Sequence, residues 1–148
     1  MSSGQYSKIL VPLDGSKNSF LALEHAVKLA ESLHAEIGIL HVTLLTQQIP
    51  IVTQLESAYI PESIISKIDA FAKHVVKEGL AKVPEGIKVQ SFCEVGSPTL
   101  VIPEFAEEHG YDMIVIGSRG LGVISGFVMG SVSNYVVHNA KCPVLVVK

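Results

Sequence analysis

The feature that most restricts the fold of this chain is a regular alternation of short apolar runs with segments whose apolar residues recur every three to four positions. A short apolar run bounded by turn residues predicts a buried strand, and the longer spacing predicts an amphipathic helix. The predicted strands cover residues 7–14, 36–43, 87–95, 112–118 and 144–147, and the predicted helices cover about 16–34, 61–80, 97–108 and 130–140.

Strands that alternate with helices predict a parallel sheet with right-handed crossovers and helices on both faces. The 148 residues, 48% of them hydrophobic, are enough for one proper core. We therefore expect residues 1–148 to form a single α/β domain with a doubly wound, five-stranded parallel sheet.

Two segments interrupt the pattern. Residues 44–60 carry no clear periodicity, and Gln47, Gln48 and Pro50 indicate a long connection. Pro103 lies within the third predicted helix, where its missing N–H removes one backbone hydrogen bond. This helix is expected either to kink there or to become regular only from about residue 103.

Composition argues against several classes of function. The net charge of −3 gives no broad basic face for neutralising nucleic-acid phosphates. The first ten residues, MSSGQYSKIL, do not resemble a secretory signal, so we expect a cytoplasmic protein. Cys93 and Cys142 form no metal-binding pattern and are interpreted as buried, reduced thiols. The six histidines show no metal-site spacing, and only His41 is expected near a pocket.

Residues 117–131, GSRGLGVISGFVMGS, hold five glycines and a single charge. Gly122, Gly126 and Gly130 recur every four residues, as in packed membrane helices. However, the stretch between Arg119 and Lys141, which has no Asp, Glu, Lys or Arg, contains many polar residues and joins two predicted core strands. A membrane span is therefore not expected. Its apolar side chains also argue against a solvated linker.

The remaining interpretation is a loop that leads from the carboxyl end of a parallel strand into a helix. Backbone amides and the helix dipole favour an anion at such a place, and glycine allows close approach and positive φ angles. Ser131 and Ser133 would add hydroxyl donors, although both are also ordinary residues for a helix start.

Two common phosphate loops do not match. No Gly-Lys-Ser/Thr occurs, and the first strand runs into PLDGS instead of a dinucleotide fingerprint. The spacing that is present is Gly117-x2-Gly120-x9-Gly130-Ser131. With ILVPLDGS near the start, HV at 41–42 and the block from DMIVIGSRG through GSVSNYVVHNAKCPVLVVK, the chain resembles the universal stress protein family over nearly its whole length.

This resemblance implies a strand order of 3-2-1-4-5 and, in one branch of the family, binding of ATP, expected here with Mg²⁺. The backbone after the fourth strand and the first turn of the last helix would hold the phosphates. Asp14 would face the ribose or adenine, unless it merely caps the first helix or turn. The residues implied to bind nucleotide are Pro12, Asp14, Val42, Ile116, Gly117, Arg119, Gly120, Gly130, Ser131, Val132 and Ser133.

The resemblance also implies a homodimer, because family members usually pair their last strand antiparallel with its copy. That strand is Val144, Leu145, Val146 and Val147 here, and pairing would cover an apolar edge. The loop at 121–129 is unusually apolar and is expected to be either a lid over nucleotide or a patch for a protein partner.

Three functions stay open at this point. The first is an ATP-binding regulatory protein with slow or no turnover, since no residue stands out as a general base. The second is an ATPase or phosphotransferase of low activity. The third is a nucleotide-free interaction protein that presents Phe127 and Met129 to a partner. AMP or a flavin nucleotide is an alternative ligand, because an amide cradle recognises phosphate rather than base.

Overall fold

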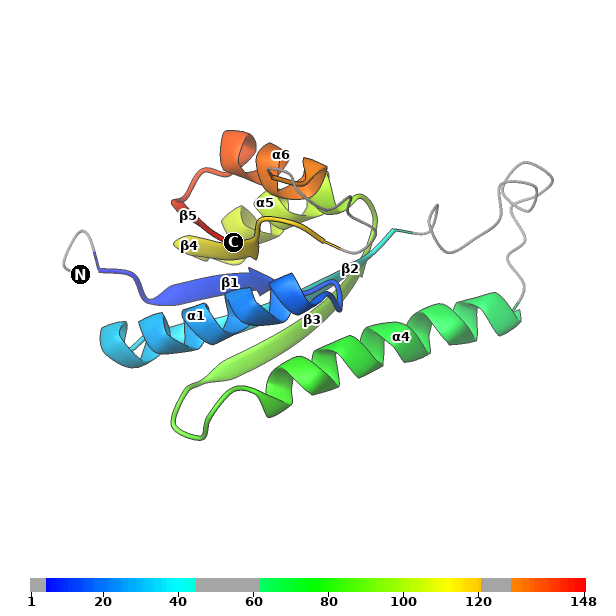
Figure 1. Cartoon of the computed structure of the whole chain (residues 1–148), viewed down its shortest axis with the longest axis horizontal. Coiled ribbons are helices and arrows are strands. Elements are labelled where there is room, and N and C mark those ends of the chain that lie inside the picture. Colours follow the sequence, from blue (N-terminus) through cyan, green and yellow to red (C-terminus); the bar gives the residue numbers. More distant parts are fainter. Residues whose placement is uncertain (1–4, 45–61, 121–128) are drawn as a thin grey trace.

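The computed structural model describes residues 5–44, 62–120 and 129–148. All of its strand pairs are parallel, and the order across the five-stranded sheet is β3-β2-β1-β4-β5 (Figure 1). The predicted α/β fold and strand order are confirmed. The elements are β1 (Lys8–Pro12), α1 (Lys17–Leu33), β2 (Glu36–Thr43), α4 (Glu62–Ala81), β3 (Val89–Val95), α5 (Pro98–Glu108), β4 (Met113–Gly117), α6 (Ser131–Asn139) and β5 (Val144–Val147).

A layer of helices covers each face of the sheet. α1 and α4 lie on one face, and α5 and α6 lie on the other (Figure 1). Side chains alternate along a strand, so Ile9 and Val11 of β1 join the first core cluster and Leu10 joins the second. The helices add Phe20, Leu23 and Val75 to the first cluster and Ile102, Phe105 and Val136 to the second.

The turn before α1 forms as its sequence predicts. Gly15 has a φ of +93°, which glycine adopts without strain. Ser16 is the N-cap, and its hydroxyl accepts a hydrogen bond from the backbone N–H of Ser19 at 3.1 Å. The helix cap is therefore Ser16 and not Asp14.

Several expectations are corrected. α5 begins at Pro98 and continues through Pro103, so a start near residue 103 is wrong. Cys93 is exposed and Cys142 is half-buried, so the predicted burial of both is wrong, although both thiols are free. On α4, Ile65 is 50% exposed, because the first turns of this helix extend past the ends of β2 and β3 (Figure 1).

Two predictions fall on residues that the structure leaves undescribed. They are the long connection at 44–60, of which only Leu44 is described, and the apolar loop at 121–129, of which only Met129 is described. Within the described ranges, no helix is both long and apolar enough to cross a membrane.

Pro12 ends the pairing of β1 with β4, which are the two strands between which the strand order reverses. The backbone N–H of Leu13 donates to the carbonyl of Leu40 in β2 at 2.8 Å. Because successive residues of a strand point their N–H groups to opposite sides, residue 12 faces β4, and proline has no N–H to donate. β1 accordingly pairs with β2 at five positions but with β4 only at Ile9 and Leu10. A crevice results at this reversal point, which is where open α/β sheets bind ligands.

Candidate functional site

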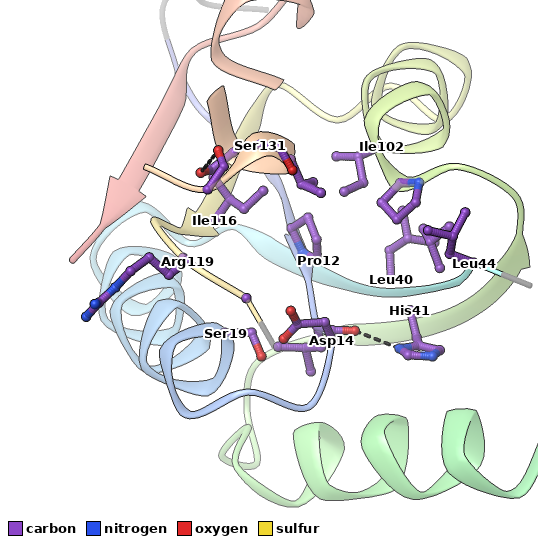
Figure 2. Close-up of a pocket in the computed structure, with 18 of the residues that line it drawn as sticks. Pro12, Asp14, Ser19, Leu40, His41, Leu44, Ile102, Ile116, Arg119 and Ser131 are labelled. Carbon is purple, nitrogen blue, oxygen red and sulfur yellow. Dashed lines mark hydrogen bonds between the residues drawn. The ribbon is translucent and has the colours of Figure 1, made fainter. Parts of the chain in front are cut away.

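A pocket lies at this crevice, at the carboxyl ends of β1, β2 and β4 (Figure 2). All of the residues predicted to bind nucleotide line it, although they come from four separate stretches of the chain. They are Pro12, Asp14, Val42, Ile116, Gly117, Arg119, Gly120, Gly130, Ser131, Val132 and Ser133.

One part of the pocket is apolar. Pro12 lies at its centre in Figure 2, with Ile116 and Ile102 beyond it and Leu40 and Leu44 to one side. These side chains come from β1, β4 and α5, and from β2 with the residue that follows it. Flat apolar walls of this kind suit an aromatic ring and provide little hydrogen bonding.

Asp14 supplies the carboxylate of the pocket. Its Oδ1 accepts a hydrogen bond from the backbone N–H of Ser16 at 2.9 Å, which holds the turn into α1. Its Oδ2 lies against Gly120, and a Cβ atom at position 120 would overlap it. The absence of a side chain at Gly120 therefore makes room for the carboxylate. A fixed negative charge here suits a hydroxyl donor or a cation and repels phosphate.

The first turn of α6 forms the opposite, polar wall. Gly130 is the N-cap, with an ordinary φ of −68° and no side-chain cap. The amides of Ser131, Val132 and Ser133 have no acceptor within their own helix, as at any helix start. Together with the helix dipole they attract an anion. Ser133 is buried, and its hydroxyl donates to the carbonyl of Ser118 at 2.9 Å, so it anchors the helix to β4.

The first two residues of the loop after β4 use their backbone amides within the protein. The N–H of Ser118 donates to Val147 O at 2.8 Å, and the N–H of Arg119 donates to Asn18 Oδ1 at 2.7 Å. Gly117, Gly120 and Gly130 all lack positive φ angles, so their expected role in left-handed turns is wrong. The side chain of Arg119 is exposed and extends away from Pro12 and Asp14 (Figure 2).

Comparison with known proteins identifies the family. The sequence model described as "Universal stress protein family" matches residues 5–148. The chain belongs to the universal stress protein family. It is 36% identical to Universal stress protein YxiE of Bacillus subtilis (strain 168), with 97% of this chain and 99% of that protein aligned.

Solved structures of other proteins share the fold. Hypothetical protein MJ0577 superposes with a TM-score of 0.82 at 30% identity, covering 97% of this chain and 96% of that one. The universal stress protein family protein At3g01520 of Arabidopsis thaliana, solved with AMP bound, superposes with a TM-score of 0.69 at 23% identity. That match covers 96% of this chain and 91% of the plant protein.

Some pocket residues of this universal stress protein were missed by sequence analysis. Phe71 of α4 and Pro98 and Ile102 of α5 also line the pocket. These residues lie on predicted helices that pack against the sheet. The sequence pattern does not indicate which end of the sheet each residue lies near. His41, which was expected near the pocket, does line it. Its Nδ1 donates to the carbonyl of Leu13 at 2.8 Å, since that oxygen can only accept.

The described part of this universal stress protein contains no group of three or more His, Cys, Asp or Glu side chains that could hold a metal ion. Asp14 is the one carboxylate among the described residues that line the pocket. A divalent cation held here would therefore take most of its ligands from a bound anion and from water, as Mg²⁺ commonly does.

Proposed function

We propose that this universal stress protein binds an adenine nucleotide, ATP with Mg²⁺, in the pocket between β1 and β4. The observation that carries the proposal is that an apolar wall, one carboxylate and an uncapped helix start converge on a single pocket. These are the three chemical parts that a base, a ribose and a phosphate chain require. A relative of known structure, At3g01520, was solved with AMP bound, which supports the ligand class.

Different residues of the pocket bind the base, the ribose and the phosphates of the nucleotide. Pro12, Val42 and Ile116 contact the base, and the backbone of Val42 forms its polar contacts. Asp14 accepts a hydrogen bond from the ribose. The amides of Gly120 and of residues 131–133 bind the phosphates, because those of Ser118 and Arg119 already donate within the protein. Mg²⁺ would sit on the phosphates, with Asp14 as the nearest carboxylate.

The proposed role is regulatory binding with little or no turnover. Among the described pocket residues, Asp14 and His41 are the groups that could take up a proton, and His41 already uses Nδ1 to hold Leu13. We further propose a homodimer formed through the free edge of β5, where Leu145 is 40% exposed. Two free thiols fit a cytoplasmic location, where cysteines stay reduced.

The test begins with untagged protein that is denatured by heat, after which the supernatant is chromatographed against nucleotide standards. Stoichiometric ATP is the expected result. Protein that is purified empty is titrated with ATP and Mg²⁺ instead. At 100 times the Kd, ATP stabilises the fold by about 2.7 kcal/mol. For a chain of this size the Tm should then rise by about 5–10 °C.

Two substitutions at Gly130 provide a matched pair. A Cβ there would lie 3.4 Å from Ser118 O, which is ordinary contact, so Gly130→Ala should keep binding. Gly130→Val adds methyl groups at the phosphate wall and should abolish the Tm shift. Recovery of ADP or AMP would favour the alternative of a slow ATPase. No bound nucleotide, and no Tm shift at millimolar ATP, would contradict the proposal and favour an interaction protein.

A further inference from the structure

Asn18, the second residue of α1, joins three parts of the molecule that are far apart in sequence. Its Oδ1 accepts a hydrogen bond from the N–H of Arg119 at 2.7 Å. Its Nδ2 donates to the carbonyl of Val147, at the end of β5, at 3.2 Å. These partners fix the orientation of the amide, since an N–H must face its oxygen and a carbonyl must face its NH₂ group. Sequence analysis did not identify this residue.

The hydrogen bonds of Asn18 close a ring with the backbone. Val147 O also accepts from the N–H of Ser118 at 2.8 Å. Ser118 and Arg119 are neighbours, so the ring runs from Val147 through one peptide unit to Asn18 and back. The end of β5 and the loop after β4 are thereby held to the same side chain.

The Ser118–Arg119 peptide is also held from its other side. In a trans peptide the C=O and the N–H point in opposite directions. While the N–H of Arg119 faces Asn18, the carbonyl of Ser118 accepts from Gly130 N at 2.6 Å and from Ser133 Oγ at 2.9 Å. A single peptide unit therefore spans the space between α1 and α6, and it sets where the first turn of α6 lies.

Gly117 is part of the same arrangement. A Cβ at this position would lie 2.5 Å from Asn18 Oδ1 and 2.9 Å from the Asn18 carbonyl, distances that real Cβ atoms do not show. Hence Gly117, the first glycine of the Gly-x2-Gly-x9-Gly-Ser spacing, allows α1 to pack closely against the end of β4. Its missing side chain makes room for Asn18 and not for a ligand.

We propose that Asn18 is a positioning residue for the nucleotide. It fixes the Ser118–Arg119 peptide so that the amides at residues 131–133 stay directed into the pocket, and it makes this arrangement depend on the end of β5. The inference rests on the proposed function, because it assigns Asn18 a role in the same pocket. Asn18 acts through Gly130 and the helix start and touches no part of the ligand.

The test compares wild type, Asn18→Ala and Asn18→Asp in two measurements. Hydrogen exchange of single amides is followed by NMR without nucleotide, and the Kd for ATP is measured by calorimetry. Alanine is the best helix former, so Asn18→Ala should fold. Loss of the fixed peptide should speed exchange at Arg119 and, through the carbonyl of Ser118, at Gly130. A misplaced anion site should weaken ATP binding by about 10-fold.

Two variants serve as controls. Asn18→Asp keeps an acceptor for the N–H of Arg119 but has no donor for Val147 O, so it should restore slow exchange at Arg119 and Gly130 without holding the end of β5. Asn139→Ala removes a comparable bond, from Asn139 Nδ2 to Tyr135 O at 2.9 Å, at the far end of α6. Neither exchange near the pocket nor the Kd should change in that variant.

The outcomes separate the two proposals. Faster exchange with an unchanged Kd would overturn the positioning role and leave Asn18 a structural residue. Unchanged exchange at both Arg119 and Gly130 would show that Asn18 does not fix the Ser118–Arg119 peptide. If wild type binds neither ATP nor AMP, the proposed function fails and positioning of nucleotide fails with it. The exchange data would still report whether Asn18 fixes the Ser118–Arg119 peptide.

Discussion

The two oxygens of Asp14 have different surroundings, and this separates its structural task from its proposed ligand contact. Oδ1 holds the N–H of Ser16 and with it the turn before α1. Oδ2 lies beside Gly120, on the pocket side. Asparagine would keep an acceptor for Ser16 and place an NH₂ group, a donor, where Oδ2 lies. Asp14→Asn therefore changes the polarity of the contact while preserving the turn.

If Oδ2 accepts a ribose hydroxyl, wild type should bind ATP about 10-fold more tightly than 2′-deoxy-ATP or 3′-deoxy-ATP, because a hydrogen bond to a charged group contributes about 1.5–3 kcal/mol. The hydroxyl can also accept from the NH₂ group of Asp14→Asn, but that bond is neutral and weaker. The preference of this variant for ATP over that deoxynucleotide should therefore fall to about 3-fold. Competition calorimetry measures both ratios. An unchanged preference in Asp14→Asn would show that another residue makes the ribose contact.

Among the described elements, β5 pairs on one side only, with β4, and the hydrogen bonds between these strands identify the residues that face each side. Ile114 N donates to Pro143 O at 3.0 Å, and Ser118 N donates to Val147 O at 2.8 Å. Residues 143, 145 and 147 therefore face β4, whereas Val144 and Val146 direct their N–H and C=O groups to the free edge. An antiparallel partner strand would bond to these two residues.

Val146→Pro should convert a dimer into a monomer. It removes a donor on the free edge and leaves every bond to β4 in place, which is where a sheet tolerates proline. The free energy of unfolding should fall by about 1–2 kcal/mol from lost packing. Val146→Ala, which loses packing but keeps the N–H, should stay dimeric. Sedimentation equilibrium gives the masses, and a dimeric Val146→Pro would place the interface elsewhere.

The strands and helices were predictable because each is encoded by local periodicity. The pocket was predictable in part, since parallel strands that alternate with helices bring their carboxyl ends to one edge. Phe71, Ile102 and Asn18 were not predictable, because their places depend on how α4, α5 and α1 cross the sheet. Gly117 shows the same limit: its pattern was recognised, but its physical reason is the close approach of α1.

For the molecule as a whole, the buried phenol of Tyr111, the half-buried thiol of Cys142 and the exposed thiol of Cys93 contribute to how stability responds to alkali. Desolvation raises the pKa of the Cys142 thiol and of the Tyr111 phenol, and it is also the main cause of the raised pKa of Cys93. In the unfolded chain these groups lose their protons near their ordinary pKa values, about 8.5 for thiols and about 10 for tyrosine. Above those values the unfolded chain binds fewer protons than the native state, so stability falls as pH rises. Below about pH 7 both states are almost fully protonated at these groups, so these groups contribute almost no pH dependence there.

Below about pH 7 the Tm should therefore be independent of these groups, and above that pH it should fall in two stages. The thiols act first and Tyr111 acts later, because their ordinary pKa values differ. The double variant Cys93→Ser/Cys142→Ser should lose the first stage only. Tyr111→Phe, which keeps the ring beside Gly38, should reduce the second. Calorimetric scans at matched ionic strength measure both stages. An identical alkaline slope in wild type and in both variants would mean that these groups keep the same pKa on unfolding and that other groups cause the loss.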